Sequence, residues 1–426
     1  MNNFLDFHKK NRVVNGKIKI RRNQITIFIG LYNANEYLDG ILAQIIKQVN
    51  QNFNLIIADN NSNDGTWERI QEWTKYFEGR IMLVRNKINV GGSGNLIINM
   101  DLIKTSWFCS FHQDDLYKNN HIQYLMQNID FKDSNLAAVT TDMGSIDNNG
   151  NVFARRMRAG WLVKNNGQVE AFVSNLFVHN GYWPSTAFNL SIFKKAAKNS
   201  LWHSSTFPDT EILLKICAYG KIKRVNKETM LYRENDASES RSINPTENLY
   251  GVFTALVRVF GSKEFKSVSK MVTEKKRAQF LQYICEGISF RLDNEELTNI
   301  AVFIVTERLV EIWGYNNSHN LNLLIKFYTE LNSNHSVSIL RNILSLGLDN
   351  SHEYELFGKK TMKLPYEVYK LKNSRKIIGR TLYKLYQTIG IYLPYAFAKT
   401  SLTALYKLKI SVTKKHPWKF YNFRNK

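Results

Sequence analysis

Two adjacent carboxylates, Asp114 and Asp115, follow a short apolar run in this chain of 426 residues, and His112 stands just before them. The apolar run over residues 106–111 has the length and composition of a buried strand. Carboxylates at the C-terminal end of such a strand lie where open α/β sheets bind their ligands. Hard cations such as Mg²⁺ and Mn²⁺ prefer oxygen ligands, often one or two carboxylates together with substrate phosphates. The pair therefore predicts a metal site, with an ordinary helix cap as the alternative.

The chain before this pair alternates between strand and helix patterns. Apolar runs of strand length occupy residues 25–31, 53–58 and 81–84, and apolar residues recur at helical spacing after each of them. The polar segments that follow the strands are rich in residues that cap helices and make tight turns. Alternation at these lengths predicts a largely parallel sheet with right-handed crossovers, in an α/β architecture of the nucleotide-binding type.

The polar segments occur in an order that resembles the family-2, GT-A type glycosyltransferases over about residues 25–245. The matching pieces are Tyr32-Asn33, Asp59-Asn60-Asn61-Ser62-Asn63-Asp64-Gly65-Thr66, Asn89-Val90-Gly91-Gly92-Ser93-Gly94-Asn95, His112-Gln113-Asp114-Asp115, Pro208-Asp209-Thr210-Glu211, and Tyr232-Arg233 with Ser238 and Ser240. The resemblance implies a Rossmann-like GT-A catalytic domain of the nucleotide-diphospho-sugar transferase type, followed by an α-helical C-terminal region.

The resemblance also implies roles for single residues. Asp209 matches the catalytic base, and Asp114 is expected to hold Mn²⁺ or Mg²⁺ with Asp115 and His112 beside it. The residues that match the nucleotide-sugar site are Tyr32, Asn33, Asp59, Asn89, Gly91, Asn95, Asp114 and Arg233. Two positions depart from the family pattern, because His112 replaces the first Asp of the metal motif and Pro208 replaces the Glu before the base. Since Pro208 cannot share a proton, Asp209 must be oriented by another group.

Each of these assignments has a plain structural alternative. Asp209 precedes an expected helix over residues 210–219, where it would serve as an N-cap and where the helix dipole would favour its ionised form. Arg233 offers forked donors to a diphosphate, or is an exposed surface arginine. Residues 144–184 match the family poorly and are expected to meet the acceptor, or to form a basic loop with core tryptophans. The side chains of interest there are Arg155, Arg156, Arg158, Trp161, His179, Tyr182 and Trp183.

The chemistry of these residue types agrees with sugar transfer. Expulsion of a diphosphate builds negative charge that a divalent ion stabilises, and the attacking hydroxyl must lose its proton to a base. The function expected is inverting transfer from a nucleotide-diphosphate sugar, with UDP- and dTDP-type donors favoured, to a saccharide or lipid-linked saccharide. Bacterial surface polysaccharide synthesis, of capsule or O-antigen, is the expected setting. The alternatives are an inactive carbohydrate-binding or scaffold protein on the same fold, and a nucleotidyltransferase.

The domains expected are a catalytic domain over residues 1–245, a helical accessory domain over 246–358 and a basic amphipathic tail over 359–426. Helices are predicted over residues 249–260, 268–292, 297–312, 320–331 and 337–346. The tail carries 17 Lys and Arg against one acid, Glu367, out of a net charge of +22 for the whole chain. Basic residues interleaved with aromatics are typical of a segment that binds an anionic membrane surface. Packing on its own protein and binding of nucleic acid are the alternatives, and the second is set aside because it leaves the catalytic domain unexplained.

Other sequence features bear on the compartment. The three cysteines show no paired spacing, which favours a reducing environment. The first 22 residues lack the apolar segment of a secretory signal, and no apolar stretch reaches the length of a bilayer span. These features predict a cytoplasmic protein that is peripheral at the inner face of the cell membrane; its oligomeric state is not predicted.

Overall fold

The computed structural model describes residues 2–21, 24–77, 79–156, 167–177, 183–198, 208–233, 245–292 and 294–313. These residues divide into two compact units. The first contains the described residues before Pro245, apart from a helix that begins at Gln168, and the second contains that helix from Val169 together with the residues after Pro245. The expected helices over 320–331 and 337–346 and the basic tail lie outside the described residues, as do Arg158, Trp161, His179, Tyr182, Ser238 and Ser240.

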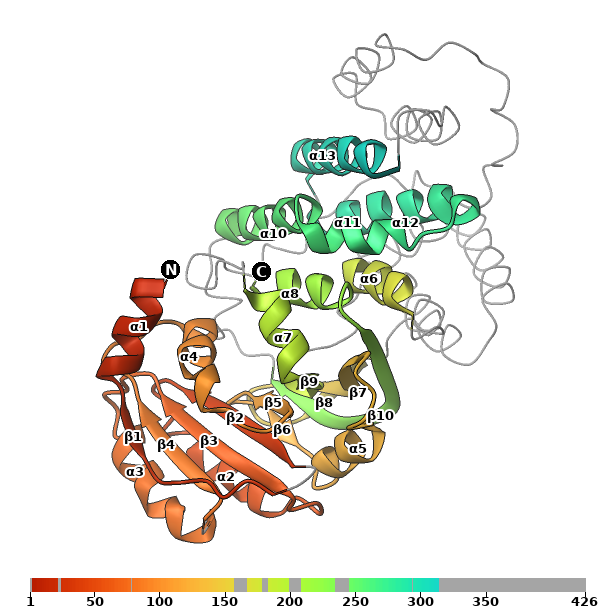
Figure 1. Ribbon diagram of the computed structural model, residues 1–426. Helices are drawn as coiled ribbons and strands as arrows, with labels where there is room; N and C mark the ends of the chain where they lie inside the picture. Colours follow the sequence, from red (N-terminus) through yellow and green to blue (C-terminus); the bar gives the residue numbers. More distant parts are fainter. Residues whose placement is uncertain are drawn as a thin grey trace, which may run out of the picture. The chain divides into compact units, whose positions relative to one another are not determined.

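The first unit is built on one twisted sheet in which ten strands are described, in the order β1-β4-β3-β2-β5-β9-β7-β10-β6, with β8 paired to β7 (Figure 1). The strands are β1 (Val13–Asn15), β2 (Ile25–Leu31), β3 (Phe53–Asp59), β4 (Ile81–Arg85), β5 (Trp107–Phe111), β6 (Leu116–Tyr117), β7 (Leu136–Ile146), β8 (Val152–Arg156), β9 (Thr186–Asn189) and β10 (Lys221–Arg233). The predicted α/β class is confirmed.

The central strands β4, β3, β2 and β5 are parallel. All seven residues of β3 are buried, as expected for a strand that is covered by helices on both faces. Strands β7 and β10 also pair parallel. The sheet departs from the predicted largely parallel arrangement at β1, β6, β8 and β9, which pair antiparallel with their neighbours. These additional strands have two to five residues each, which is too short for a periodic pattern to mark them.

Helices connect the parallel strands and cover the sheet. Helices α2 (Leu38–Ile46) and α3 (Thr66–Trp73) contact each other on one face, and α4 (Gly92–Asn99) packs on β2 and β3 from the other face (Figure 1). Helix α1 (Asn2–Asn11) lies against α4. The remaining helices of this unit are α5 (His121–Asn128), α7 (Leu190–Ala197) and α8 (Pro208–Ile216), with 3-10 turns at Thr74–Phe77, Met100–Leu102 and Trp183–Ser185.

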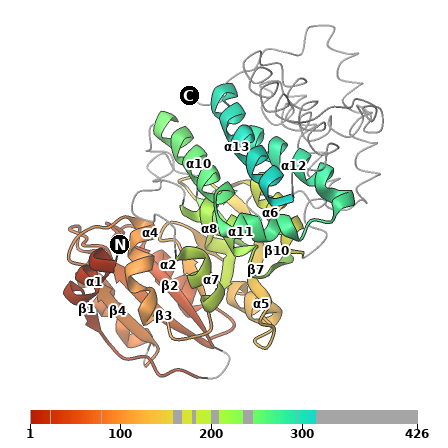
Figure 2. The same ribbon diagram turned by 45° about the horizontal axis from the view of Figure 1, so that its top comes forward.

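The second unit is helical. It consists of α6 (Gln168–Phe177), α10 (Pro245–Phe260), α11 (Lys263–Lys270), α12 (Glu274–Leu292) and α13 (Glu295–Trp313), and Figure 2 shows α10 to α13 packed together. The single helix predicted over residues 268–292 is wrong, since α11 ends at Lys270 and α12 begins at Glu274. The N–H of Met271 turns back to the carbonyls of Val268 and Ser269 and closes α11.

Candidate active site

The parallel strands bring the predicted site residues to one edge of the sheet. Leu31 of β2 pairs with Asp59 of β3, and Ile29 pairs with Phe111 of β5, so the three strands end close together. The residues that follow β2 are Tyr32 and Asn33, and the turn after β5 holds His112 to Asp115. The carboxyl ends of parallel strands are where α/β sheets bind ligands.

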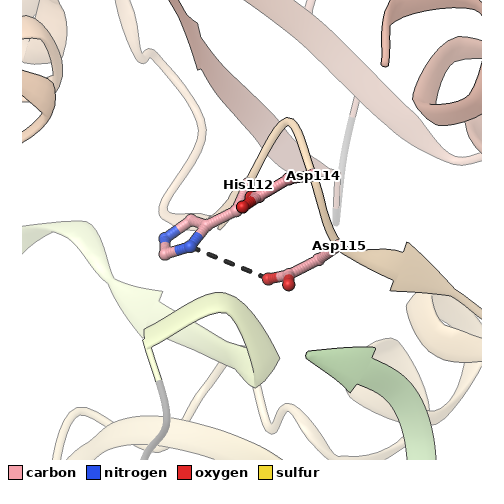
Figure 3. Close-up of side chains that lie close together, drawn as sticks. All are labelled: His112, Asp114 and Asp115. Carbon is pink, nitrogen blue, oxygen red and sulfur yellow. Dashed lines mark ion pairs between the residues drawn. The ribbon is translucent and has the colours of Figure 1, made fainter. Parts of the chain in front are cut away.

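The turn between β5 and β6 gathers a set of possible metal ligands. One ligand atom each from His112, Asp114 and Asp115 can be chosen so that all three lie within 4.8 Å of one another. Figure 3 shows the imidazole directed toward the Asp115 carboxylate, and the His112 Nδ1 to Asp115 Oδ2 distance is 3.7 Å. Ligands of Mg²⁺ lie at about 2.1 Å from the ion, so two opposite ligands are about 4.2 Å apart. The spacing of the three residues is thus of the order that such an ion requires.

Hydrogen bonds from side chains and from the backbone hold this turn. The side chain of Gln113 accepts from the N–H of Tyr32 at 3.0 Å and donates to its carbonyl at 3.2 Å. The N–H of His112 donates to the Tyr117 hydroxyl at 2.9 Å. Asp115 is buried, and its Oδ1 accepts from the N–H of Arg233 at 2.9 Å. The turn is thereby tied to the ends of β2, β6 and β10.

Arg233 uses its guanidinium within the protein. Its Nε donates to the carbonyl of Asp114 at 2.8 Å, and its Nη1 donates to the carbonyls of Asp147 and Asn148 at 2.9 and 3.0 Å. The alternative of a free surface arginine does not describe this arrangement, and the predicted diphosphate contact stays a prediction. Arg233 links the carboxylate turn to the turn at residues 147–148, and it holds Asp114 through its main chain.

Asp209, the predicted base, lies in the first turn of α8. Its charge and that of Asp114 both act on His112: burial lowers the pKa of His112, and the two carboxylates oppose that decrease without cancelling it. The charge of Asp209 therefore reaches the carboxylate turn, although Asp209 lies 94 positions after Asp115 in the sequence. The His112 side chain is 39% exposed, so the neutral imidazole remains open to a ligand.

The charges of Asp114 and Arg233 also act on Tyr37. Burial raises its pKa, the charges of Glu36 and Asp114 raise it further, and Arg233 lowers it. The residue lies at the start of α2, so this helix approaches the carboxylate turn as well.

The Asp59 carboxylate is fully buried at the end of β3. It accepts from the N–H of Ser62 at 3.2 Å and lies 3.2 Å from the Nε of Arg85. Burial raises the pKa of Asp59, and the hydrogen bonds from Ser62 and the charge of Arg85 lower it by less. Asn33 closes the same loop, since its N–H donates to the Ser62 hydroxyl and its Oδ1 accepts from the N–H of Asn63.

The residues predicted in the glycine-rich segment differ in their exposure to solvent. Gly91 is exposed and has a φ of 76°, a conformation that glycine adopts without strain. The Oδ1 of Asn89 accepts from the N–H of Gly91 at 2.9 Å. Asn95 is buried in α4, and its amide donates to the carbonyl of Ala58 at 2.7 Å. Asn95 is too buried in this structure to contact a nucleotide sugar directly, and it lies behind the site.

Among the residues expected to meet an acceptor, Trp183 is the aromatic side chain that the structure describes. Its ring lies against Phe188 and Phe193, with centroid distances of 5.1 and 5.4 Å. This contact agrees with the alternative that assigned the tryptophan to the core.

Several residues of the site were not singled out in the sequence. Arg85, Ser62, Tyr117 and Tyr37 each contact or act on a predicted residue, and Gln113 stood inside the recognised motif without a role. Arg85 directly follows the strand predicted over residues 81–84, and Ser62 stands inside a recognised motif; these positions are the signals that would have marked them. Tyr37 acts on the turn from a distant segment, and Tyr117 contacts His112 through its hydroxyl, so neither leaves a local pattern.

Comparison with known proteins bears mainly on the first unit. Residues 26–196 match the model of glycosyl transferase family 2. This region is similar to that family. An uncharacterized glycosyltransferase of Haemophilus influenzae is 27% identical over 109 residues, which is 26% of this chain and 33% of that protein. The abequosyltransferase RfbV of Salmonella typhimurium is 31% identical over 108 residues, or 25% of this chain and 32% of that protein. The matches thus span about a third of these relatives.

The family 2 region has the GT-A-like fold that the resemblance implied, with its mixed sheet and its carboxylate turn after β5. The solved structure of residues 1–349 of TarS from S. aureus, in complex with UDP-GlcNAc, covers 68% of this chain and 90% of that one, at 11% identity and a TM-score of 0.46. Within the described residues, no helix has the length and apolar character that a membrane span requires.

Proposed function

We propose that this chain transfers a sugar from a nucleotide-diphosphate sugar to a saccharide acceptor, with inversion at the anomeric carbon. The observation that carries the proposal is geometric: β2, β3 and β5 end at one edge of the sheet, and the turn after β5 gathers His112, Asp114 and Asp115 within 4.8 Å of one another. The charge of Asp209 acts on His112 of this turn, which supports a role for Asp209 in the same site. The match of residues 26–196 to the model of glycosyl transferase family 2 supports sugar transfer as the reaction.

The donor is proposed to bind along the ends of β2, β3 and β4. Asp59 and the loop that Ser62 and Asn33 close would receive the nucleoside, and Tyr32, 43% exposed, offers an aromatic face beside it. The exposed backbone at Gly91 would meet the diphosphate, because a glycine without a Cβ allows close approach. UDP- and dTDP-type donors remain the first to test.

Asp114, with Asp115 and His112, is proposed to hold Mn²⁺ or Mg²⁺. Such an ion, when bound, neutralises the negative charge that develops on the leaving diphosphate. Asp114 is half-exposed and its main chain is fixed by Arg233, so its carboxylate is presented in one place. Asp115 is buried and already accepts a hydrogen bond, which suits a supporting ligand.

Asp209 is proposed to be the general base. The acceptor hydroxyl would give its proton to the Asp209 carboxylate as its oxygen attacks the anomeric carbon. The bond from that carbon to the diphosphate breaks, and its electron pair leaves with the diphosphate. Attack from the side opposite the leaving group gives inversion.

The cellular setting is a further part of the proposal. We propose transfer to a lipid-linked saccharide in surface polysaccharide synthesis, at the inner face of the membrane. The basic tail would then bind the anionic membrane surface. The support is the sequence of residues 359–426, with one acid among 17 basic residues.

A panel of nucleotide sugars, each with and without Mn²⁺, tests the donor assignment by thermal stabilisation of the full chain. A donor at about 100 times its Kd should add about 2.7 kcal/mol to the apparent stability. The proposal predicts that one donor stabilises the protein and that the shift needs the ion. If no member of the panel shifts the transition, the chain is better explained as a scaffold protein on the same fold.

A further inference from the structure

Four buried asparagines lie behind the glycine-rich segment: Asn60, Asn86, Asn95 and Asn99. Each is at most 2% exposed, and we refer to them as the asparagine chain. They come from the residue after β3, the residue after β4 and two successive turns of α4. Buried amides are costly unless their hydrogen bonds are satisfied, so their partners define how they can be oriented.

Main-chain groups fix the orientation of the amide nearest the site. Asn60 accepts from the N–H of Val90 at its Oδ1, at 3.1 Å. Its Nδ2 must then face the other way, and it donates to Asn89 Oδ1 at 2.6 Å and to the carbonyl of Gly91 at 3.2 Å. The Asn60 side chain thus holds the loop at both Val90 and Gly91.

The amides on α4 are fixed in the same manner. Asn95 donates from Nδ2 to the carbonyl of Ala58, so its Oδ1 is the acceptor that faces the other amides. Asn99 donates from Nδ2 to the carbonyl of Asn95 at 2.9 Å and to its Oδ1 at 3.0 Å. The Oδ1 of Asn99 is therefore the end of the chain that needs a donor.

Asn86 joins the two ends. Its Nδ2 donates to Asn60 Oδ1 at 3.0 Å and to Asn95 Oδ1 at 2.8 Å, and its Oδ1 accepts from Asn99 Nδ2 at 3.2 Å. One continuous direction of donation runs from Asn99 through Asn86 to Asn60 and on to the loop. Hydrogen bonds in such a chain polarise and strengthen one another in a low-dielectric interior.

Arg12 supplies the donor at the far end. Its Nη1 donates to Asn99 Oδ1 at 3.2 Å and to the carbonyl of Ile98, and both terminal nitrogens bind the Asp101 carboxylate, at 2.9 and 2.8 Å. The Arg12 side chain is 7% exposed. It lies outside the residues that match the family, between α1 and β1.

We propose that Arg12 is a positioning residue for the donor-binding loop, acting through the asparagine chain on Asn89 to Gly91. A guanidinium can only donate, so at Asn99 it supports the direction of donation that the main-chain partners set for the other amides. The N-terminal segment before β2 is then part of the machinery that shapes the site. Where donor binding is concerned, this inference rests on the proposed function; the loop conformation does not depend on it.

Hydrogen exchange tests the loop directly, without any substrate. In the full chain, Arg12→Gln should speed exchange of the Val90 and Gly91 amides by about tenfold, the factor that corresponds to about 1.4 kcal/mol. Amides of β3, such as that of Ile56, should keep their protection. Lys10→Gln, which removes the same charge from an exposed position two residues earlier, should leave both regions unchanged.

Two further variants keep the test decisive if Arg12→Gln folds poorly. Arg12→Lys retains the charge beside Asp101 but cannot donate in a fork, so an intermediate rate is expected. Asn86→Asp keeps the size of the side chain but removes both of its donated bonds. It should speed hydrogen exchange at the Val90 and Gly91 amides, as Arg12→Gln does. A variant that speeds loop and strand amides equally would show general destabilisation and overturn the proposal, as would unchanged exchange at Val90 and Gly91.

Kinetics separate this inference from the proposed function. With a donor identified, Arg12→Gln should raise the KM for the donor about tenfold while the kcat and the KM for the acceptor stay within about twofold. A fall in kcat alone would contradict a role in donor positioning. If no nucleotide sugar is turned over by the wild type, the proposed function fails, and the exchange result still decides the role of Arg12.

Discussion

Asp209 illustrates what can and cannot be predicted for a single residue. Its resemblance to a family base marked it in the sequence, but its electrostatic effect on His112 depends on the tertiary structure, since the two residues are 97 positions apart. The substitution of His112 for an acid is compatible with a metal site, because burial lowers its pKa and favours the neutral form that binds metals. The motif positions of Asn95 and Arg233 did not reveal that both side chains donate hydrogen bonds to main-chain carbonyls of the protein.

Asp209→Asn should separate donor binding from turnover. The amide keeps the shape of the side chain but cannot accept the proton, so turnover should fall by at least about a hundredfold, the scale of general-base catalysis. Donor affinity, measured by calorimetry, should change little. Glu72→Gln, which makes the same change at an exposed carboxylate on α3, is the control. Full activity of the Asp209 variant would remove the base assignment.

His121 should make the first unit sensitive to acid. It is fully buried on α5, its Nδ1 lies 2.6 Å from the Thr229 hydroxyl, and burial lowers its pKa from 6.5 to about 3. Between these two values the unfolded chain binds a proton that the folded protein does not, so stability falls as the pH decreases from 6.5 toward 3. The loss between pH 7 and pH 5 should be about 2 kcal/mol.

Urea unfolding at several pH values measures this loss. His121→Gln retains a polar side chain that does not titrate. In this variant the loss of unfolding free energy between pH 7 and pH 5 should be smaller by about 2 kcal/mol. An equal slope in the variant and the wild type would assign the acid sensitivity to other groups.

At the scale of elements, the strands that were long and apolar could be predicted, and the short ones could not. Residues 25–31 form β2 with the predicted bounds, because seven consecutive apolar or small residues leave few alternatives to a buried strand. Strand β9 has four residues and pairs with β5 and β7, both of which lie much earlier in the sequence. Its position is decided by tertiary contacts, so local periodicity carried no signal for it.

Two glycines allow a matched test of this packing. A Cβ at Gly220, just before β10, would lie 2.5 Å from the carbonyl oxygen of Asn135, whereas a Cβ at Gly40 in α2 would meet nothing within 4 Å. Gly220→Ala should therefore cost about 1–3 kcal/mol of stability, the usual range for overpacking. Gly40→Ala should increase the free energy of unfolding by up to about 1 kcal/mol, because alanine favours a helix. Denaturant midpoints compare the two, and a neutral Gly220→Ala would show that β10 is not closely held there.

At the scale of the whole molecule, the charge is concentrated in one part of the sequence. Residues 359–426 carry 17 of the 58 Lys and Arg residues and one of the 36 acids. The two described units hold the site and a helical bundle, and the tail lies outside the described residues. Its role therefore rests on sequence and is open to direct test.

Removal of residues 366–426 should abolish binding to anionic vesicles, because basic residues near such a surface contribute about 1 kcal/mol each. Binding by the intact chain should weaken as salt rises, since charges are screened within about 8 Å at physiological ionic strength. Turnover on a short water-soluble acceptor should survive the truncation. Neutral vesicles and a cooperative thermal transition are the controls. A folded, truncated protein that still sediments with anionic vesicles would rule out the tail as the anchor.

The most direct test of sugar transfer is the identity of the released product. The full chain is incubated with the nucleotide sugar that stabilises it, a saccharide acceptor and Mn²⁺, and the nucleotide products are quantified together with the transferred sugar. We predict one nucleoside diphosphate for each sugar transferred, and loss of both products in chelator and in Asp114→Ala. Release of pyrophosphate, or undiminished transfer by Asp114→Ala in chelator, would contradict a metal-assisted glycosyltransferase.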